Sequence, residues 1–264
     1  MSLESKRAAL QDRAHLFEKA RSFFSQRGIL EVDTPMLSTK APIDEHIEIM
    51  PVSLGEGKTG YLHSSPEYAM KRLLSLGLGD IYQMSHVFRQ GELSPLHNPE
   101  FTMVEWYRMH TDFDSFIEET AAFIHVFLGE LPLEKISYRE AFLQFAKVDY
   151  LHASKDNLLQ KAQEHGLDIS SSLTKEELLH LLMGFVIEPH LGKNGLTALV
   201  DYPASQAALA KTELRGEEAI AKRFEIYYEG VELANGYLEL TDAKKQEERL
   251  NEASSKRKIG RAHV

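Results

Sequence analysis

Apolar residues recur at helical spacing at the start of the chain. Between residues 3 and 27 they stand mostly three or four positions apart, and Gly28 follows where a helix C-terminus favours glycine. The spacing therefore predicts a helix over this segment. Residues 29–32 then indicate a short strand that ends before Pro35, because proline removes a backbone donor.

The next stretch predicts a β-hairpin and a second helix. Residues 46–52 and 61–63 are strand-like and flank a glycine-rich loop at 55–60. Residues 65–67 combine a capping serine, a proline at the first helical position and an acidic first turn, which are typical of a helix N-terminus.

Longer strands and a helical region follow. Residues 80–89 and 100–108 are strand-like, and the polar loop between them predicts that they pair as an antiparallel hairpin. Residues 114–188 are mostly helical, which indicates an insertion of about 112–190. Residues 223–228 and 231–240 are again strand-like, and a charged helix is predicted for 242–258.

Antiparallel strands flanked by helices predict an α+β fold, with a single domain over residues 1–264. No glycine-rich dinucleotide motif or P-loop follows a strand, so any nucleotide must be held in another way.

Composition fits a globular enzyme and excludes several other classes. Hydrophobic residues make up 43% of the 264 positions, and the absence of cysteine excludes disulfides, thiolate nucleophiles and cysteine-ligated zinc. The formal net charge of -10 argues against a broad basic surface for nucleic acid. Because the sequence has no signal-like core and no membrane-spanning run, we expect a cytoplasmic protein without a membrane partner.

Candidate chemistry is concentrated in the hairpin of residues 80–108. Arg89 ends one strand and Phe101 begins the next, so a phosphate-binding guanidinium and a ring that can stack on a purine stand close together. Glu105 and Tyr107 alternate with apolar neighbours and share one face of the second strand. On spacing alone, a half-buried hairpin with solvated charges is the simpler explanation.

Four segments, in the same order, resemble class II aminoacyl-tRNA synthetases. Residues 88–107 resemble motif 2, and the run HNPEFTM-V-E-W-Y is similar to the lysine-specific branch. Residues 20–36 resemble motif 1, which implies a homodimer through this segment. Residues 64–67 resemble the substrate loop, and 232–242 resemble the segment ELANG…ELTD. The resemblance runs from about residue 10 to the end of the chain and implies the class II catalytic fold.

Within the lysine branch, the chain is most similar to the short ligases that modify elongation factor P. Motif 1 begins near residue 20, which leaves no room for an anticodon-binding domain, and Trp106, Arg108 and residues 202–210 match the short ligases better. The resemblance implies ATP-dependent activation of lysine or (R)-β-lysine as an aminoacyl adenylate. The acceptor would be a lysine side chain of elongation factor P, and tRNA is not expected to bind.

The resemblance also implies an ATP site. Arg89 would be catalytic, because it would bind the α-phosphate and stabilise the charge of adenylyl transfer. Glu225 and Glu232 would bind Mg²⁺ bridging the phosphates, since hard carboxylate oxygens suit this ion. The residues implied for ATP are Arg89, Gln90, Gly91, Glu92, His97, Asn98, Phe101, Glu232 and Leu233.

An amino-acid site is implied in the same way. Glu67 would bind the amine nearest the reacting carboxylate, and the distal ammonium would enter a separate pocket. Each ammonium needs a carboxylate partner once it leaves water, so a site of this kind rejects analogues that lack an amine. The implied residues are Ser65, Pro66, Glu67, Glu105, Tyr107, Asn235 and Glu239.

Strand geometry leaves two of these roles open. Glu225 could simply face solvent. Glu232 and Glu239 are seven residues apart and lie on opposite faces of a regular strand, so a bulge at 235–236 is needed to bring both to one site. The 12 histidines include no i, i+4 pair with a third ligand, so no structural metal is expected.

The sequence departs from the family pattern in two places. Gly91 stands where motif 2 has an acidic residue, and we expect Glu92 to replace it through a one-residue adjustment. No glycine-rich motif 3 with its arginine is present, so the C-terminal part of the fold is expected to be missing. The alternatives are therefore a lysyl-tRNA synthetase catalytic fragment that acts on tRNA, and a non-catalytic truncated paralogue with a binding or regulatory role.

Overall fold

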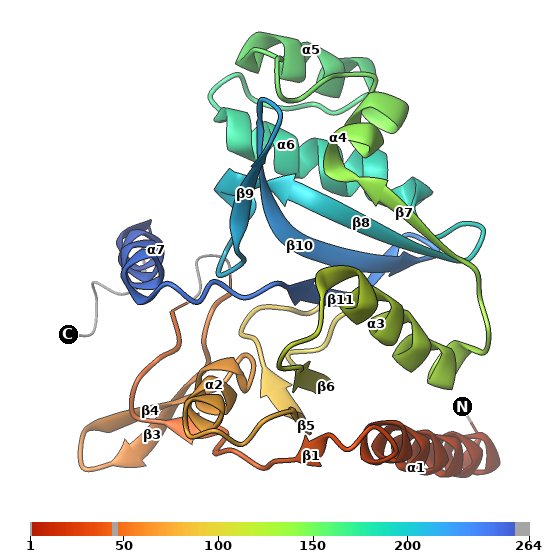
Figure 1. The fold of residues 1–264 in the computed structure, drawn as a ribbon, viewed down its shortest axis with the longest axis vertical. Coiled ribbons are helices and arrows are strands. Elements are labelled where there is room, and N and C mark those ends of the chain that lie inside the picture. The colour runs from red at the N-terminus through yellow and green to blue at the C-terminus, as the bar shows by residue number, and fades with distance from the viewer. Residues whose placement is uncertain (1, 44–46, 257–264) are drawn as a thin grey trace. The chain divides into compact units, whose positions relative to one another are not determined.

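The computed structural model describes residues 2–43 and 47–256, and the chain divides into two compact units (Figure 1). The first unit holds residues 1–111 together with 247–264, and the second holds residues 112–246. Two predicted elements extend beyond the described residues, the strand from residue 46 and the helix ending at residue 258. No helix in the described part of the chain is long and apolar enough to cross a membrane.

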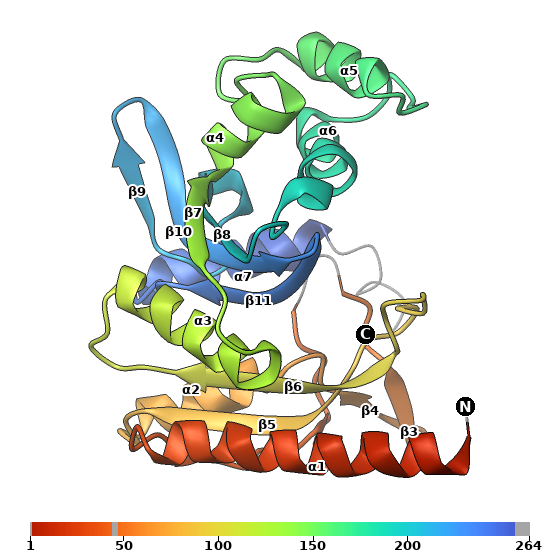
Figure 2. The ribbon, with the colours of Figure 1, turned by 90° about the vertical axis from the view of Figure 1, so that its right-hand side faces the viewer.

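The first unit begins with α1 (Leu3–Ser25), as the spacing predicted. Its N-terminus is capped by the Ser2 hydroxyl, which accepts the Ser5 N–H at 3.1 Å. Gly28 follows with a φ of 69°, the left-handed conformation that favours glycine after a helix. Figure 2 shows α1 lying along β5 (Ile81–Phe88), against which it packs the buried Phe24.

The first unit also contains two small sheets and a second helix. One sheet has the order β1-β5-β6, in which β1 is Leu30–Glu31 and β6 is Glu100–Tyr107. The other has the order β2-β4-β3, formed by β2 (Leu37–Ser38), β4 (Lys58–Leu62) and β3 (Pro51–Gly55). The helix α2 spans Glu67–Ser75.

The second unit contains helices around a larger sheet. The sheet has the order β11-β10-β8-β7, and β9 pairs with β10. Its strands are β7 (Leu133–Ser137), β8 (Leu196–Pro203), β9 (Thr212–Arg215), β10 (Glu218–Tyr228) and β11 (Val231–Tyr237). The helical segments are α3 (Phe113–Leu128), α4 (Tyr138–Ala141), η1 (Phe142–Ala146), α5 (Lys155–Glu164), α6 (Lys175–Leu182), η2 (Met183–Ile187), η3 (Glu188–His190) and η4 (Ala204–Gln206). The helix α7 (Ala243–Lys256) follows β11.

Alternation along β10 sends its side chains to two different cores. Phe224 and Ile226 pack with Ile117 of α3 on one face of the sheet. Tyr227 packs on the other face with the cluster that contains residues of α4, α5 and α6, where Leu182 is fully buried. Residues 223, 225 and 227 therefore share the face that looks toward these helices.

The structure corrects the prediction of a wholly antiparallel sheet. The strand β7 lies inside the region expected to be helical, and it pairs in parallel with β8, which was not predicted. The strand β1 also pairs in parallel with β5. The α+β class is confirmed, since helices and mixed sheets alternate in both units.

Two local boundaries also differ from expectation. The predicted loop at 55–60 is a tight turn in which Glu56 and Gly57 have φ values of 51° and 73°, because β4 already begins at Lys58. Pro66 occupies the N-cap of α2 and not the first helical position, and the cap makes no side-chain hydrogen bond.

Candidate active site

The hairpin of β5 and β6 places Arg89 beside the start of β6. The two strands pair without a register shift from Ile81 opposite Tyr107 to Phe88 opposite Glu100. Arg89 follows β5 directly, and its N–H donates to the Pro99 carbonyl at 2.9 Å. This hydrogen bond continues the ladder by one residue and fixes the start of the Arg89 side chain.

Arg89 and Phe101 are in contact, as their places in the sequence suggested. The guanidinium carbon of Arg89 lies 5.1 Å from the Phe101 ring centroid, and both side chains are only partly exposed. The Arg89 Nε is buried and has no hydrogen-bond partner among the residues that the structure describes. A buried donor of this kind has the chemistry to bind an anionic oxygen.

Glu92 lies beside Arg89 in the loop that follows β5. Its carboxylate lies 3.8 Å from Arg89 Nη1. Gly91, between them, has a φ of 81°, a conformation that a residue with a Cβ adopts only with strain. Glycine at this position is compatible with this backbone, and the replacement of the family's acidic residue by Glu92 stays a prediction.

The rest of the hairpin loop is open to solvent. Gln90, His97 and Asn98 are exposed, and the backbone N–H of Gln90 donates to the Glu48 carbonyl at 2.9 Å. The His97 ring nitrogen Nδ1 lies 2.9 Å from the Ser94 hydroxyl, which closes a short turn at the tip. Within the described part of the chain, the His97 and Asn98 side chains form no hydrogen bond or ion pair with Arg89.

The predicted amino-acid residues of the first unit meet at the face of β6 that carries Phe101. The Tyr107 hydroxyl donates to Glu105 Oε1 at 2.7 Å. Trp106 lies on the opposite face, where it packs 5.5 Å from Phe24 of α1. Covering of one face by α1 therefore leaves the other face for the polar candidates.

The start of α2 brings Glu67 toward the same group. Glu67 is the first residue of the helix, and its N–H donates to the Ser65 hydroxyl at 3.4 Å. Lys71, one turn later, donates to Glu67 Oε1 at 2.7 Å and stands 5.9 Å from the Tyr107 ring centroid. Sequence reasoning did not single out Lys71, because a Glu–Lys pair at this spacing is common on helices.

The remaining candidates lie in the second unit, on β10 and β11. Glu225 stands opposite Asn235, and Tyr227 stands opposite Glu232. The register shifts between these pairs, because Leu233 is an extra residue on β11. Cross-strand partners share a face, so this bulge puts all four paired side chains on one face.

The bulge lies earlier than the expected position at 235–236. It is Leu233 that interrupts the alternation, and this side chain is 42% exposed. Asn235 donates to the Tyr237 hydroxyl at 3.1 Å, while Glu239 forms an isolated bridge with Ala210 beyond the strand. Residues 235, 237 and 239 keep the ordinary two-residue period.

Glu225 is buried, which excludes the reading in which it faces solvent. Its Oε2 accepts hydrogen bonds from the Tyr202 and Tyr227 hydroxyls, each at 2.5 Å, and Arg223 Nη2 donates to Oε1. Three of the roughly four acceptor positions of the carboxylate are therefore used. Arg223 is in turn held by the Gln206 carbonyl at 3.1 Å.

Glu188 extends this buried cluster. The Tyr227 hydroxyl lies 3.3 Å from Glu188 Oε1, and burial followed by the nearby Glu225 raises the pKa of Glu188. Burial and Glu225 likewise raise the pKa of Tyr202 and Tyr227, so both hydroxyls keep their protons at neutral pH. No periodicity in the sequence pointed to these residues as partners of Glu225.

The structure thus forms two groups of candidates, one in each unit. The first contains Ser65, Pro66, Glu67, Arg89, Gln90, Gly91, Glu92, His97, Asn98, Phe101, Glu105 and Tyr107. The second contains Glu225, Glu232, Leu233, Asn235 and Glu239. Within the described ranges, no cluster of three or more acidic or histidine side chains has the arrangement of a metal site.

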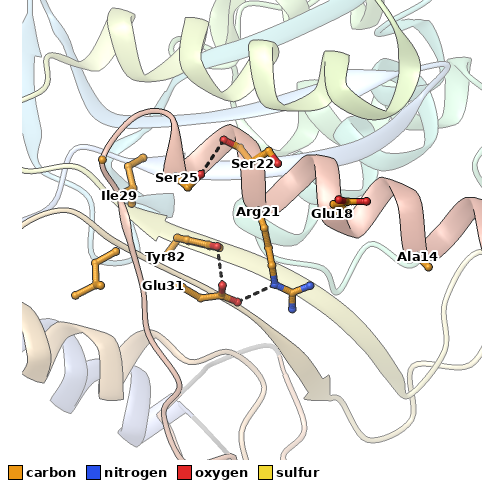
Figure 3. Close-up of a pocket in the computed structure, with 10 residues that line it drawn as sticks. Ala14, Glu18, Arg21, Ser22, Ser25, Ile29, Glu31 and Tyr82 are labelled. Atoms are coloured by element: carbon orange, nitrogen blue, oxygen red, sulfur yellow. Dashed lines mark hydrogen bonds and ion pairs between the residues drawn. The ribbon is translucent and has the colours of Figure 1, made fainter.

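A cavity of about 630 Å³ in the first unit contains none of these residues (Figure 3). It is lined by α1, β1 and Tyr82 of β5, and most of its lining residues belong to the segment 20–36 that resembles motif 1. Glu31 organises it, because its carboxylate accepts from Arg21 Nε at 3.1 Å and from the Tyr82 hydroxyl at 2.8 Å. Burial and Glu31 raise the pKa of Tyr82, which therefore remains the donor.

Comparison with known proteins identifies the family of this chain. The family model described as tRNA synthetases class II (D, K and N) matches residues 1–262. An elongation factor P–(R)-beta-lysine ligase from Avibacterium paragallinarum is 41% identical over 253 residues, which cover 94% of this chain and 78% of the relative.

Two further relatives carry the same name. The Salmonella typhi protein is 42% identical over 257 residues, covering 94% of this chain and 78% of the relative. The Histophilus somni (strain 2336) protein is 42% identical over 245 residues, covering 91% and 76%. The chain therefore belongs to the class II (D, K and N) tRNA synthetase family, together with these elongation factor P–(R)-beta-lysine ligases.

Proposed function

We propose that this chain uses ATP to activate (R)-β-lysine, or lysine, as an aminoacyl adenylate and transfers it to a lysine side chain of elongation factor P. The observation that carries the proposal is the face of β6, which holds both Phe101, in contact with Arg89, and the Glu105–Tyr107 pair. The names of relatives that are 41–42% identical supply the acceptor.

The residues present fit ATP. Arg89 has a buried Nε without a partner in the described part of the chain, and its guanidinium covers an aromatic ring. ATP supplies the adenylyl group and leaves as pyrophosphate. Arg89 binds the α-phosphate and stabilises the charge that develops there, while Phe101 stacks on the adenine. No side chain is needed as a covalent nucleophile, because positioning and electrostatics carry this reaction.

Glu225 and Glu232 can both contribute to a Mg²⁺ site, but Glu225 has few acceptor positions left for the ion. The bulge at Leu233 puts both carboxylates on one face of paired strands, and Glu232 is exposed. Mg²⁺ usually takes only one or two protein carboxylates and completes its shell with phosphate and water. Glu225 has about one acceptor position left, so Glu232 is the principal ligand in this proposal.

The carboxylates of the first unit fit a substrate with two ammonium groups. Glu67 binds the amine nearest the reacting carboxylate, and Glu105 with Tyr107 binds the distal ammonium. Asn235 and Glu239 complete the distal pocket in this proposal. An amine removed from water needs a charged partner, so these side chains select a diamino acid.

The remaining predictions concern the whole protein. We propose a homodimer formed through residues 20–36, a cytoplasmic location, and a catalytic domain whose residues 112–190 are an insertion. The dimer is supported by the likeness of residues 20–36 to motif 1. The cavity beside α1 is lined in part by polar side chains of this segment. Sedimentation of the purified chain tests this part by itself.

ATP–pyrophosphate exchange tests activation. The purified chain is incubated with ATP, Mg²⁺ and labelled pyrophosphate, with (R)-β-lysine, lysine or neither. Amino-acid-dependent formation of labelled ATP is the expected result. Absence of exchange with both amino acids would contradict the proposal and would favour a non-catalytic paralogue.

A further inference from the structure

Lys71 and Glu67 form an ion pair along α2. They stand four positions apart, so their side chains lie on the same face of the helix, and Glu67 precedes Lys71 in the favoured order. Lys71 Nζ donates to Glu67 Oε1 at 2.7 Å. A fully exposed pair of this kind contributes little to stability and would suggest no function.

Two observations separate this pair from an ordinary surface pair. The Lys71 and Glu67 side chains are only 24% and 26% exposed. In addition, Lys71 Nζ lies 5.9 Å from the Tyr107 ring centroid, and the Tyr107 hydroxyl is bound to Glu105. The resident ammonium therefore lies between a carboxylate and an aromatic ring, the surroundings that proteins use to bind alkylammonium ligands.

The arrangement leaves one oxygen of Glu67 available. Oε1 is bound to Lys71, and no side chain among the described residues forms a hydrogen bond or ion pair with Oε2. A carboxylate can rotate about its last bond, so an anchored Oε1 sets the direction in which Oε2 points. One fixed oxygen then determines where an amine can sit.

We propose that Lys71 is a positioning residue of the amino-acid site, which holds Glu67 Oε1 so that Oε2 receives the substrate amine nearest the reacting carboxylate. The proposal rests on the proposed function, because it takes Glu67 as the partner of that amine. The two candidate substrates differ in the carbon that bears this amine. A carboxylate with one fixed oxygen can distinguish them, whereas a freely rotating one follows the amine to either position.

Calorimetric titration measures the role of Lys71. Binding of (R)-β-lysine, of lysine, and of an analogue that lacks only the amine nearest the carboxylate is measured for the wild type and for Lys71→Met. We expect Lys71→Met to weaken (R)-β-lysine binding about tenfold. The dissociation constants for (R)-β-lysine and lysine should also become more similar than in the wild type. Binding of the analogue should not change, since it does not use Glu67.

Further variants separate positioning from a general structural effect. Lys71→Arg keeps the ion pair and should bind like the wild type. Lys71→Met should have no additional effect in the Glu67→Gln background, because the carboxylate that Lys71 orients is gone. Lys58→Met is the matched control, since Lys58 is 72% exposed at the start of β4. Melting temperatures confirm that each variant folds.

Two results with Lys71→Met would overturn the proposal. Unchanged (R)-β-lysine binding in this variant would make the contact an ordinary helix pair. Tighter binding would show that Lys71 competes with the substrate for Glu67.

A wild type that binds (R)-β-lysine but does not modify elongation factor P refutes the proposed acceptor and leaves the role of Lys71 intact. A wild type that binds none of the ligands refutes both.

Discussion

Arg89 lies over the ring of Phe101, with its guanidinium carbon 5.1 Å from the ring centroid. The contact joins the end of β5 to the start of β6, and the uninterrupted strand register fixes both side chains. A phosphate-binding cation and a base-stacking ring therefore come from adjacent positions of one hairpin.

Substitutions at these two positions should affect ATP in different ways. Arg89→Ala removes the group that stabilises the transferring phosphate, so exchange should fall at least about 100-fold. Phe101→Leu removes base stacking worth about 1–3 kcal/mol, so the KM for ATP should rise about tenfold or more while kcat changes less. Exchange kinetics at varied ATP concentration separate the two effects. Normal exchange in Arg89→Ala would refute its catalytic role.

Glu105→Gln should weaken amino-acid binding without affecting ATP. The substitution removes the charge that the Tyr107 hydroxyl orients at 2.7 Å, so the KM for (R)-β-lysine should rise about 10- to 100-fold. Glu100→Gln is the control, because Glu100 is exposed on the other face of β6. Equal KM values for the two variants would place the distal ammonium elsewhere.

Loss of one hydroxyl at Glu225 should destabilise the second unit. Tyr202→Phe removes a hydrogen bond to a buried carboxylate and should lower the free energy of unfolding by about 1.5–3 kcal/mol. The same variant should require more Mg²⁺ for half-maximal exchange, because Glu225 is less well held. Chemical denaturation measures the free energy of unfolding, and a Mg²⁺ titration measures the concentration needed for half-maximal exchange. Tyr228→Phe is the control and should behave like the wild type, because the Tyr228 hydroxyl forms no hydrogen bond with the described residues.

His63 should make stability depend on pH. Burial lowers the pKa of His63 from 6.5, although its hydrogen bond to the His86 carbonyl, at 2.8 Å, acts in the opposite direction. The unfolded chain therefore binds the proton more readily than the folded chain. Stability from this group is complete above pH 6.5 and is lost as the pH falls from 6.5 toward the folded pKa.

Unfolding experiments between pH 5 and 8 check this sign. The unfolding free energy of the wild type should fall toward the acidic end more steeply than that of His63→Gln, which has no group to titrate there. His165→Gln, at an exposed position, should keep the wild-type slope. Identical slopes for the wild type and His63→Gln would contradict the assignment.

The sequence predicted the first helix and the long hairpin well, because their signals are local. The apolar spacing of α1, its glycine end and the polar loop between two alternating runs each specify one element. The strand β7 was missed because it is short, carries Glu134 and Lys135, and gains its stability from parallel pairing with β8. Such long-range pairing leaves no signal in the segment itself.

The candidate site was predictable where residues are near in sequence. The Arg89–Phe101 and Glu105–Tyr107 contacts follow from one hairpin, in which Gly91 has a positive φ that favours glycine. The burial of Glu225 under Tyr202 and Tyr227 could not be predicted, since it depends on the packing of β8 against β10. The position of the bulge at Leu233 was likewise set by cross-strand packing and not by alternation.

Transfer of labelled (R)-β-lysine tests the central claim most directly. The purified chain, ATP and Mg²⁺ are incubated with labelled (R)-β-lysine and either elongation factor P or tRNA, and label in each acceptor is measured. The account predicts label on elongation factor P, its loss in Arg89→Ala, and none on tRNA. Label on tRNA alone, or on neither acceptor, would contradict it.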